Sequence, residues 1–155
     1  MIKPRTLLVA VVLAFHGFTF KYDAPKTVED YATECGISVE EFTFISSVVE
    51  AESNRSTDGD LTGRIYIAVT ILNRVNDDRF PNSITEVLTQ SGQFSTVRGG
   101  QSVTNRTEYS DEAVLEAYEW IAEGDAPQTF FFNCRGYFSS RTAVGEYGGN
   151  YFSGF

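Results

Sequence analysis

Glu52 ends the segment 39–52 and is the residue whose spacing points most directly to chemistry. At roughly 100° per residue, a helix over this segment places Ile45, Val48 and Val49 within about 60° of the glutamate. A carboxyl group against an apolar wall has its ionised form disfavoured, as a general acid requires. The sequence therefore predicts a proton donor at a helix end, half in the core and half in a cleft.

Histidine-dependent chemistry is excluded, because the single histidine, His16, lies in the apolar N-terminal segment. Hydrolases with Ser-His-Asp or Cys-His sites need a histidine in the folded domain, as do the usual zinc peptidases and amidases. The chain also has no P-loop and no dinucleotide-binding fingerprint, so we expect neither a cofactor nor a metal. Carboxylate chemistry remains, and it suits the cleavage of glycosidic bonds.

The composition is that of one globular domain with an acidic surface. The chain has 155 residues and a formal charge of -9, and 42% of its residues are hydrophobic. A nucleic-acid-binding protein needs a basic face, so no nucleic-acid partner is expected. Binding of a carbohydrate would depend on hydrogen bonds and ring stacking, for which an aromatic content of 14% is well suited.

The N-terminus has the pattern of an export signal. Lys3 and Arg5 precede an apolar run over residues 7–15, which is too short for a comfortable membrane span. We expect residues 1–24 to be a signal peptide or membrane-anchor segment, with transient membrane association through residues 7–20. Residues 25–155 would then form a single catalytic domain that acts in the cell envelope, the periplasm or the extracellular space. A buried N-terminal strand or helix is the alternative.

Only two cysteines are available, Cys35 and Cys134. Their wide separation argues against a metal site, and in an exported chain they could form one disulfide. Two unpaired buried thiols are the other outcome.

Helix starts are marked by polar residues followed by an acid three positions later. Such capping boxes begin at Thr27, Ser38 and Ser83, and further caps are expected at Asp60 and Ser110. The helix after Asp60 is apolar on nearly every side, which predicts a central position.

The remaining segments are irregular or strand-like. Residues 91–105 have no period and are predicted to be an irregular loop, whereas residues 129–132 and 141–152 are aromatic and strand-like. The sequence therefore predicts a mainly helical α+β domain with a small β element late in the chain.

Six blocks carry recognisable text: VVEAES at 48–53, IAVTILNRV at 67–75, RFPNSITEV at 79–87, SGQFSTV at 91–97, FFN at 131–133 and GGNYF at 148–152. They resemble, in the same order, the motifs VVYAEA, VAVAAVILNRV, FPNTIxEV, PGQFSPV, YFYN and GxHxF of SleB/CwlJ-type cell-wall hydrolases, the spore-cortex-lytic enzymes and their phage relatives. The resemblance covers about residues 40 to 152. Asn150 stands where the family usually has histidine, and Cys134 where it usually has proline. The loop after Ser53 lacks the usual second glutamate.

The resemblance implies a lysozyme-like (lytic transglycosylase-like) fold in which Glu52 is the catalytic acid. It also implies peptidoglycan as the substrate, cut between N-acetylmuramic acid and N-acetylglucosamine, in a phage endolysin-like or secreted bacterial protein. With no second carboxylate nearby, a lytic transglycosylase outcome is expected. One alternative is a hydrolytic muramidase with Asp58 or Asp60 as second carboxylate. Another is a non-catalytic wall-binding or virion structural module.

Five further residues are candidates for substrate binding. Gln93 and Ser95 offer amide and hydroxyl groups to a sugar, and Phe94 offers either a stacking or a packing surface. Phe131 and Asn133 are expected to line the groove from the β element.

Two polar residues at the end of the central helix have structural interpretations. Asn73 is expected to be a structural hydrogen-bonding residue, and Arg74 a surface or ion-paired one.

Overall fold

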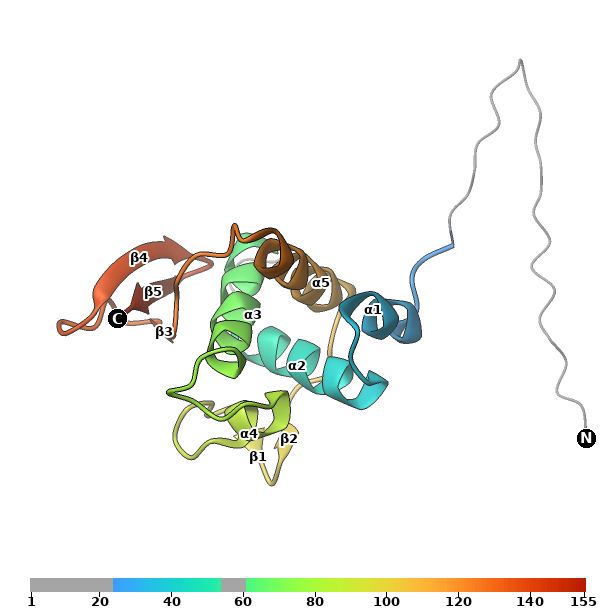
Figure 1. The fold of residues 1–155 in the computed structure, drawn as a ribbon. Helices are drawn as coiled ribbons and strands as arrows, with labels where there is room; N and C mark the ends of the chain where they lie inside the picture. The colour runs from blue at the N-terminus through green and yellow to red at the C-terminus, as the bar shows by residue number, and fades with distance from the viewer. Residues whose placement is uncertain (1–23, 54–60) are drawn as a thin grey trace, which may run out of the picture.

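The computed structural model describes residues 24–53 and 61–155 (Figure 1). The expected export segment and both alternative carboxylates, Asp58 and Asp60, lie outside these ranges. The helices are α1 (Val28–Cys35), α2 (Val39–Glu52), α3 (Leu61–Val75), α4 (Ile84–Thr89) and α5 (Glu108–Glu123). The strands are β1 (Val97–Arg98), β2 (Gln101–Ser102), β3 (Phe131–Asn133), β4 (Thr142–Tyr147) and β5 (Asn150–Gly154). The α+β class with a late β element is confirmed.

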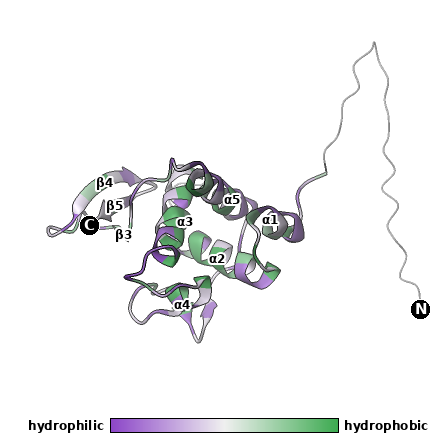
Figure 2. Ribbon diagram, in the orientation of Figure 1, coloured by the Kyte–Doolittle hydropathy of each residue, from purple (hydrophilic) through white to green (hydrophobic). Residues whose placement is uncertain are grey.

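Helix α3 is the centre of the core, as its apolar pattern predicted. It packs against α5 on one side and contacts α2, α4 and the sheet on others. Side chains such as Ile67, Val69 and Ile71 are completely buried, and each contributes roughly 1.5–3 kcal/mol by leaving water. Both α2 and α3 accordingly carry long hydrophobic stretches (Figure 2).

The predicted helix starts at Thr27, Ser38 and Ser83 are confirmed, since each side chain accepts a hydrogen bond from the backbone N–H three residues later. The prediction that Ser110 caps α5 was wrong. The N-cap is Thr107, three residues earlier, and Ser110 occupies the third helical position. The Thr107 hydroxyl accepts from the Ser110 N–H, and the Ser110 hydroxyl accepts from the Thr107 N–H, so the two form their own capping box.

The segment 91–105 was predicted to be an irregular loop and instead contains a small hairpin. Strands β1 and β2 pair antiparallel through Val97–Ser102 and Arg98–Gln101. The connection is Gly99-Gly100, and both glycines have positive φ, at 59° and 79°. Positive φ at both central positions is what a two-residue hairpin turn of type I′ requires.

The second sheet is antiparallel with strand order β3-β5-β4 and lies at the end of the molecule opposite α1 (Figure 1). Aromatic stacking fixes it to α3. The ring of Tyr66 lies 4.0 Å from that of Tyr147 in β4 and 5.3 Å from that of Phe152 in β5. The sheet therefore docks on the central helix through large apolar contacts.

Polar side chains fasten the same helix to the segment before β3. Asn73 donates from Nδ2 to the carbonyl oxygens of Pro127 and Thr129, both at 2.9 Å. The structural role expected for Asn73 is therefore confirmed.

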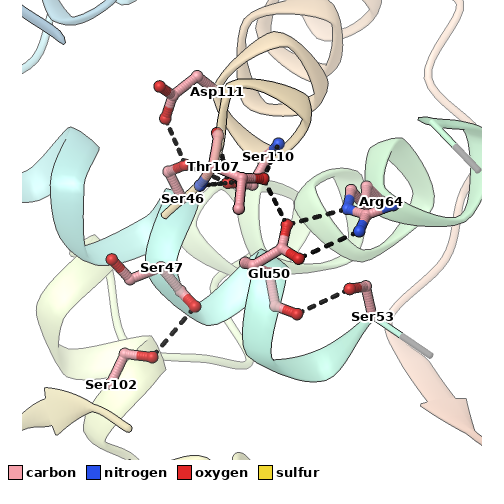
Figure 3. Close-up of polar contacts among 9 residues, drawn as sticks. All are labelled: Ser46, Ser47, Glu50, Ser53, Arg64, Ser102, Thr107, Ser110 and Asp111. Carbon is pink, nitrogen blue, oxygen red and sulfur yellow. Dashed lines mark hydrogen bonds and ion pairs between the residues drawn. The ribbon is translucent and has the colours of Figure 1, made fainter. Parts of the chain in front are cut away.

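Helix α2 also takes part in a largely buried polar cluster around Glu50 (Figure 3). Arg64 donates from Nε and Nη2 to the two carboxylate oxygens of Glu50, at 3.0 and 3.1 Å. The Thr107 hydroxyl donates to the same carboxylate at 2.7 Å. Because Thr107 also caps α5, it links the start of α5 to α2, and the Glu50 carboxylate extends the link to Arg64 of α3.

Among the described residues, no helix has the length and apolar character needed to cross a membrane.

Thr107→Ala should destabilise the protein more than the removal of an exposed cap. It removes the cap of α5, worth about 1–2 kcal/mol, and also a donor to the buried Glu50 carboxylate. Thr27→Ala, at the exposed cap of α1, is the matched control and should cost about 1 kcal/mol or less. Guanidinium unfolding at equilibrium measures both, and an equal or smaller loss for Thr107→Ala would contradict the assigned double role.

Candidate active site

One cleft of about 640 Å³ is lined by all six residues that the sequence singled out. They are Glu52, Gln93, Phe94, Ser95, Phe131 and Asn133. The cleft lies between the end of α2, the loop that precedes β1, and β3 of the second sheet. Segments separated by some 80 positions therefore meet around a single glutamate.

Glu52 is the last helical residue of α2 and is half-buried. Its neighbours on the helix, Ile45, Val48 and Val49, are completely buried, so the predicted apolar wall behind it is present. The Thr96 hydroxyl donates to Glu52 Oε1 at 2.5 Å. The other oxygen, Oε2, has no hydrogen bond to the described residues.

Two contacts to Glu52 come from distant parts of the chain. Thr96 reaches its carboxylate from the loop before β1, and Asn150 Nδ2 donates to its backbone carbonyl at 3.5 Å from β5. Sequence reasoning missed Thr96. Asn150 was noted only as a departure from the histidine of the motif, and it is buried at 4% exposure. A contact made only by folding leaves no local pattern in the sequence, so neither could be found there.

Two of the three side-chain amides that line the cleft have their oxygens committed. Gln93 Oε1 accepts from Arg74 Nη1 at 3.0 Å, and Asn133 Oδ1 accepts from the Arg135 backbone N–H at 2.9 Å. Each amide therefore keeps its NH₂ group as a donor. Donors of this kind suit hydroxyl and acetamido oxygens of a sugar.

Arg74 was expected to be a surface or ion-paired residue, and this was wrong. It is buried at 4% exposure, lines the cleft, and has no carboxylate partner among the described residues. Its Nε donates to the Phe130 carbonyl at 2.7 Å, and three rings surround the guanidinium. Burial lowers the pKa of Arg74 to about 10, so it stays charged at neutral pH. The methylene stem of Arg74 is apolar, so it can be buried although it ends in a charged group. From the end of α3, the side chains of Asn73 and Arg74 both reach the segment before β3.

The aromatic residues divide between wall and floor. Phe94 is 5% exposed and packs against Phe132, with ring centres 6.3 Å apart, so it forms part of the floor. Phe131 is half-buried and is held near two arginines, Arg74 and Arg141. Ser95 is exposed at the edge of the cleft.

The two cysteines do not form a disulfide. Cys35 is a half-buried free thiol on α1, and Cys134 is an exposed free thiol that lines the cleft. Burial raises the pKa of Cys35 to about 12.

A family model described as Cell Wall Hydrolase matches residues 58–153. The chain belongs to this family. The expected relationship to cell-wall hydrolases is therefore confirmed.

Curated relatives of this chain are spore cortex-lytic enzymes. The enzyme of Bacillus cereus is 30% identical over 99 residues, which is 63% of this chain and 36% of the relative. That of Bacillus subtilis (strain 168) is 38% identical over 72 residues, or 46% of this chain and 23% of the relative. The chain thus spans about a third or less of the length of these relatives.

Two solved structures share the fold. The catalytic domain of the germination-specific lytic transglycosylase SleB from Bacillus anthracis matches with a TM-score of 0.60 and 26% identity, over 76% of this chain and 97% of that one. The catalytic domain of the Bacillus cereus SleB protein matches with a TM-score of 0.60 and 24% identity, over 75% and 91%. The expected lysozyme-like fold is confirmed.

Native-state labelling with N-ethylmaleimide should modify Cys134 and spare Cys35. The first thiol is exposed in the cleft, whereas the second is half-buried with a raised pKa, so its reactive thiolate is scarce at pH 7.5. Mass spectrometry of peptides locates the label, and Cys134→Ser is the control that should remain unlabelled. Equal labelling of both thiols, or a disulfide between them, would contradict the structure.

Proposed function

We propose that this cell wall hydrolase cleaves the glycan strands of peptidoglycan between N-acetylmuramic acid and N-acetylglucosamine, with Glu52 as general acid and base. One observation carries the proposal: Glu52 ends a buried helix in a cleft whose other walls present amide and hydroxyl donors. The names of the relatives, spore cortex-lytic enzymes and a lytic transglycosylase, support the same substrate class.

The first step is proton transfer. Protonated Glu52 donates its proton to the glycosidic oxygen as the bond from that oxygen to the muramic C1 breaks. Thr96 holds Oε1, which leaves Oε2 to carry the proton toward the substrate. The leaving sugar then departs with a new hydroxyl group.

In the second step the muramic 6-hydroxyl attacks C1. Glu52, now a carboxylate, takes the proton of that hydroxyl, and the product is a 1,6-anhydromuramic residue. No water is consumed, and Glu52 returns to its protonated form. This lytic transglycosylase outcome is favoured because Glu52 is the only carboxylate lining the cleft among the described residues.

A hydrolytic muramidase is the second candidate. It would use Asp58 or Asp60 to activate a water and would release a reducing muramic end. Both residues follow Glu52 closely in the sequence, and this proximity is what favours the alternative.

The sugar rings of the substrate would be bound by hydrogen-bond donors rather than by charged groups. The free NH₂ groups of Gln93 and Asn133 suit acetamido and hydroxyl oxygens, and Ser95 adds a hydroxyl at the edge. The half-buried Phe131 forms part of the wall, while the buried Phe94 supports the floor. Activity on peptidoglycan also requires the protein to reach the cell envelope, which the export pattern of residues 1–24 would provide.

The proposal is tested by the muropeptides released from purified sacculi. Wild type should release 1,6-anhydromuramic products that mass spectrometry identifies by the loss of one water relative to reducing ends. Glu52→Gln keeps the shape but cannot act as an acid, so the rate should fall by about 10²–10⁴-fold while the fold is retained.

Glu40→Gln is the matched control, since Glu40 is an exposed glutamate of the same helix outside the cleft. Release of reducing ends alone would favour the muramidase. If neither wild type nor Glu52→Gln cleaves the walls and both bind them equally well, the result would favour a non-catalytic wall-binding or virion module.

Thr96 is proposed as a positioning residue for the Glu52 carboxylate. Thr96→Val keeps the shape and removes the hydroxyl, so kcat should fall about tenfold with KM little changed, because the acid loses its fixed orientation. Thr96→Ser retains the hydroxyl and should recover most of kcat. Steady-state kinetics on soluble glycan strands decides, and an equal defect in both variants would sink the assignment.

A further inference from the structure

Two arginines line the cleft, and only one carboxylate does among the described residues. Arg74 reaches it from α3, and Arg141 from the residue before β4, while Glu52 is the single acid. The chain as a whole carries a formal charge of -9. The described lining of the cleft therefore carries a net positive charge in an acidic protein.

The charge on Arg74 is buried and is compensated only by neutral groups. Its hydrogen bonds go to the Phe130 carbonyl and to the Gln93 amide oxygen, and its Nη2 has no partner among the described residues. Removing a cation from water costs free energy unless an anion or several hydrogen bonds replace the solvent. The Arg74 guanidinium lies beside the cleft with Nη2 unpartnered and no anion against it among the described residues. It can therefore bind an anionic ligand.

Arg141 lies at the same wall and is exposed. Its Cζ lies 4.1 Å from the centre of the Phe131 ring, and the Cζ of Arg74 lies 5.4 Å from the centre of that ring. One ring thus holds both guanidinium groups in place through cation–π contacts. Both guanidinium groups line the cleft beside the Phe131 ring, and neither has an acidic partner there among the described residues.

Guanidinium groups pair with carboxylates through two parallel hydrogen bonds. N-acetylmuramic acid differs from N-acetylglucosamine by a lactyl branch that ends in a carboxyl group, which in walls carries a stem peptide with carboxylates of its own. We propose that Arg74 and Arg141 form a subsite for a carboxylate on this muramic branch. This inference rests on the proposed function and narrows its substrate to strands that carry a negative charge at that position.

The test measures binding separately from cleavage. Glu52→Gln is titrated calorimetrically with three soluble fragments: a disaccharide–tripeptide with free carboxylates, the same fragment with those carboxylates amidated, and a peptide-free disaccharide with a free lactyl carboxylate. The free carboxylate fragment should bind about tenfold tighter than the amidated one, as expected for one charge-assisted contact. Tight binding of the peptide-free fragment would assign the contact to the lactyl group, and weak binding to the stem peptide.

Arg141→Gln in the same background should abolish this preference. Arg141 is exposed, so its loss should not unfold the protein. Arg79→Gln is the matched control, because Arg79 also stacks on Phe155 but does not line the cleft, and it should keep the preference. Equal affinity for free and amidated fragments together with weak binding of the peptide-free disaccharide, or a preference that survives Arg141→Gln, overturns the subsite.

The two proposals fail in different ways. If wild type cleaves strands but shows no carboxylate preference, the subsite is wrong and the proposed function stands. If wild type cleaves nothing while Glu52→Gln keeps an Arg141-dependent preference, the subsite stands and the catalytic proposal is wrong.

Discussion

Asn73 and Arg74, at the carboxyl end of α3, donate hydrogen bonds to the backbone carbonyl groups of Pro127, Thr129 and Phe130. These carbonyls belong to an irregular segment, and buried ones would otherwise lack partners. Leaving a buried acceptor unsatisfied costs about 1–3 kcal/mol. Because this segment leads directly into β3, the same bonds set where the aromatic wall stands relative to the end of α2. The cleft therefore depends on two adjacent side chains of the central helix.

The opposite face of α2 is held by charges that the cleft does not use. Glu50 is satisfied by Arg64 and Thr107, and Ser46 donates to the buried Asp111, which Arg106 also contacts. Burial raises the pKa of Asp111, despite these donors. Removing either partner would leave a buried charge, so the arrangement specifies one position for α2. Because these contacts hold α2 on the side away from the cleft, its last residue, Glu52, can face a ligand in the cleft.

Local patterns in the sequence were sufficient to predict most of the helices and strands. They also predicted the cleft residues that belong to the recognised sequence motifs. Capping boxes and helical periodicity located α1 to α4, and the glutamate at the end of α2 followed from the apolar positions before it. The start of α5 was misplaced because Thr107 and Ser110 can each act as a cap, and tertiary contacts of Thr107 decide between them. Arg74 and Thr96 act across elements, so no spacing along the chain could reveal their roles. The β1–β2 hairpin was missed because two-residue strands carry no alternation.

The contact between Asn150 and the Glu52 carbonyl joins positions 98 apart in the chain. The strand that carries Asn150 also pairs with both other strands of its sheet, so it is the central one. Because β5 is hydrogen-bonded along both edges, Asn150 has little freedom to move. The backbone carbonyl of Glu52 is therefore tied to the most constrained strand of the sheet. A shift of that sheet relative to the helices would displace the glutamate as well.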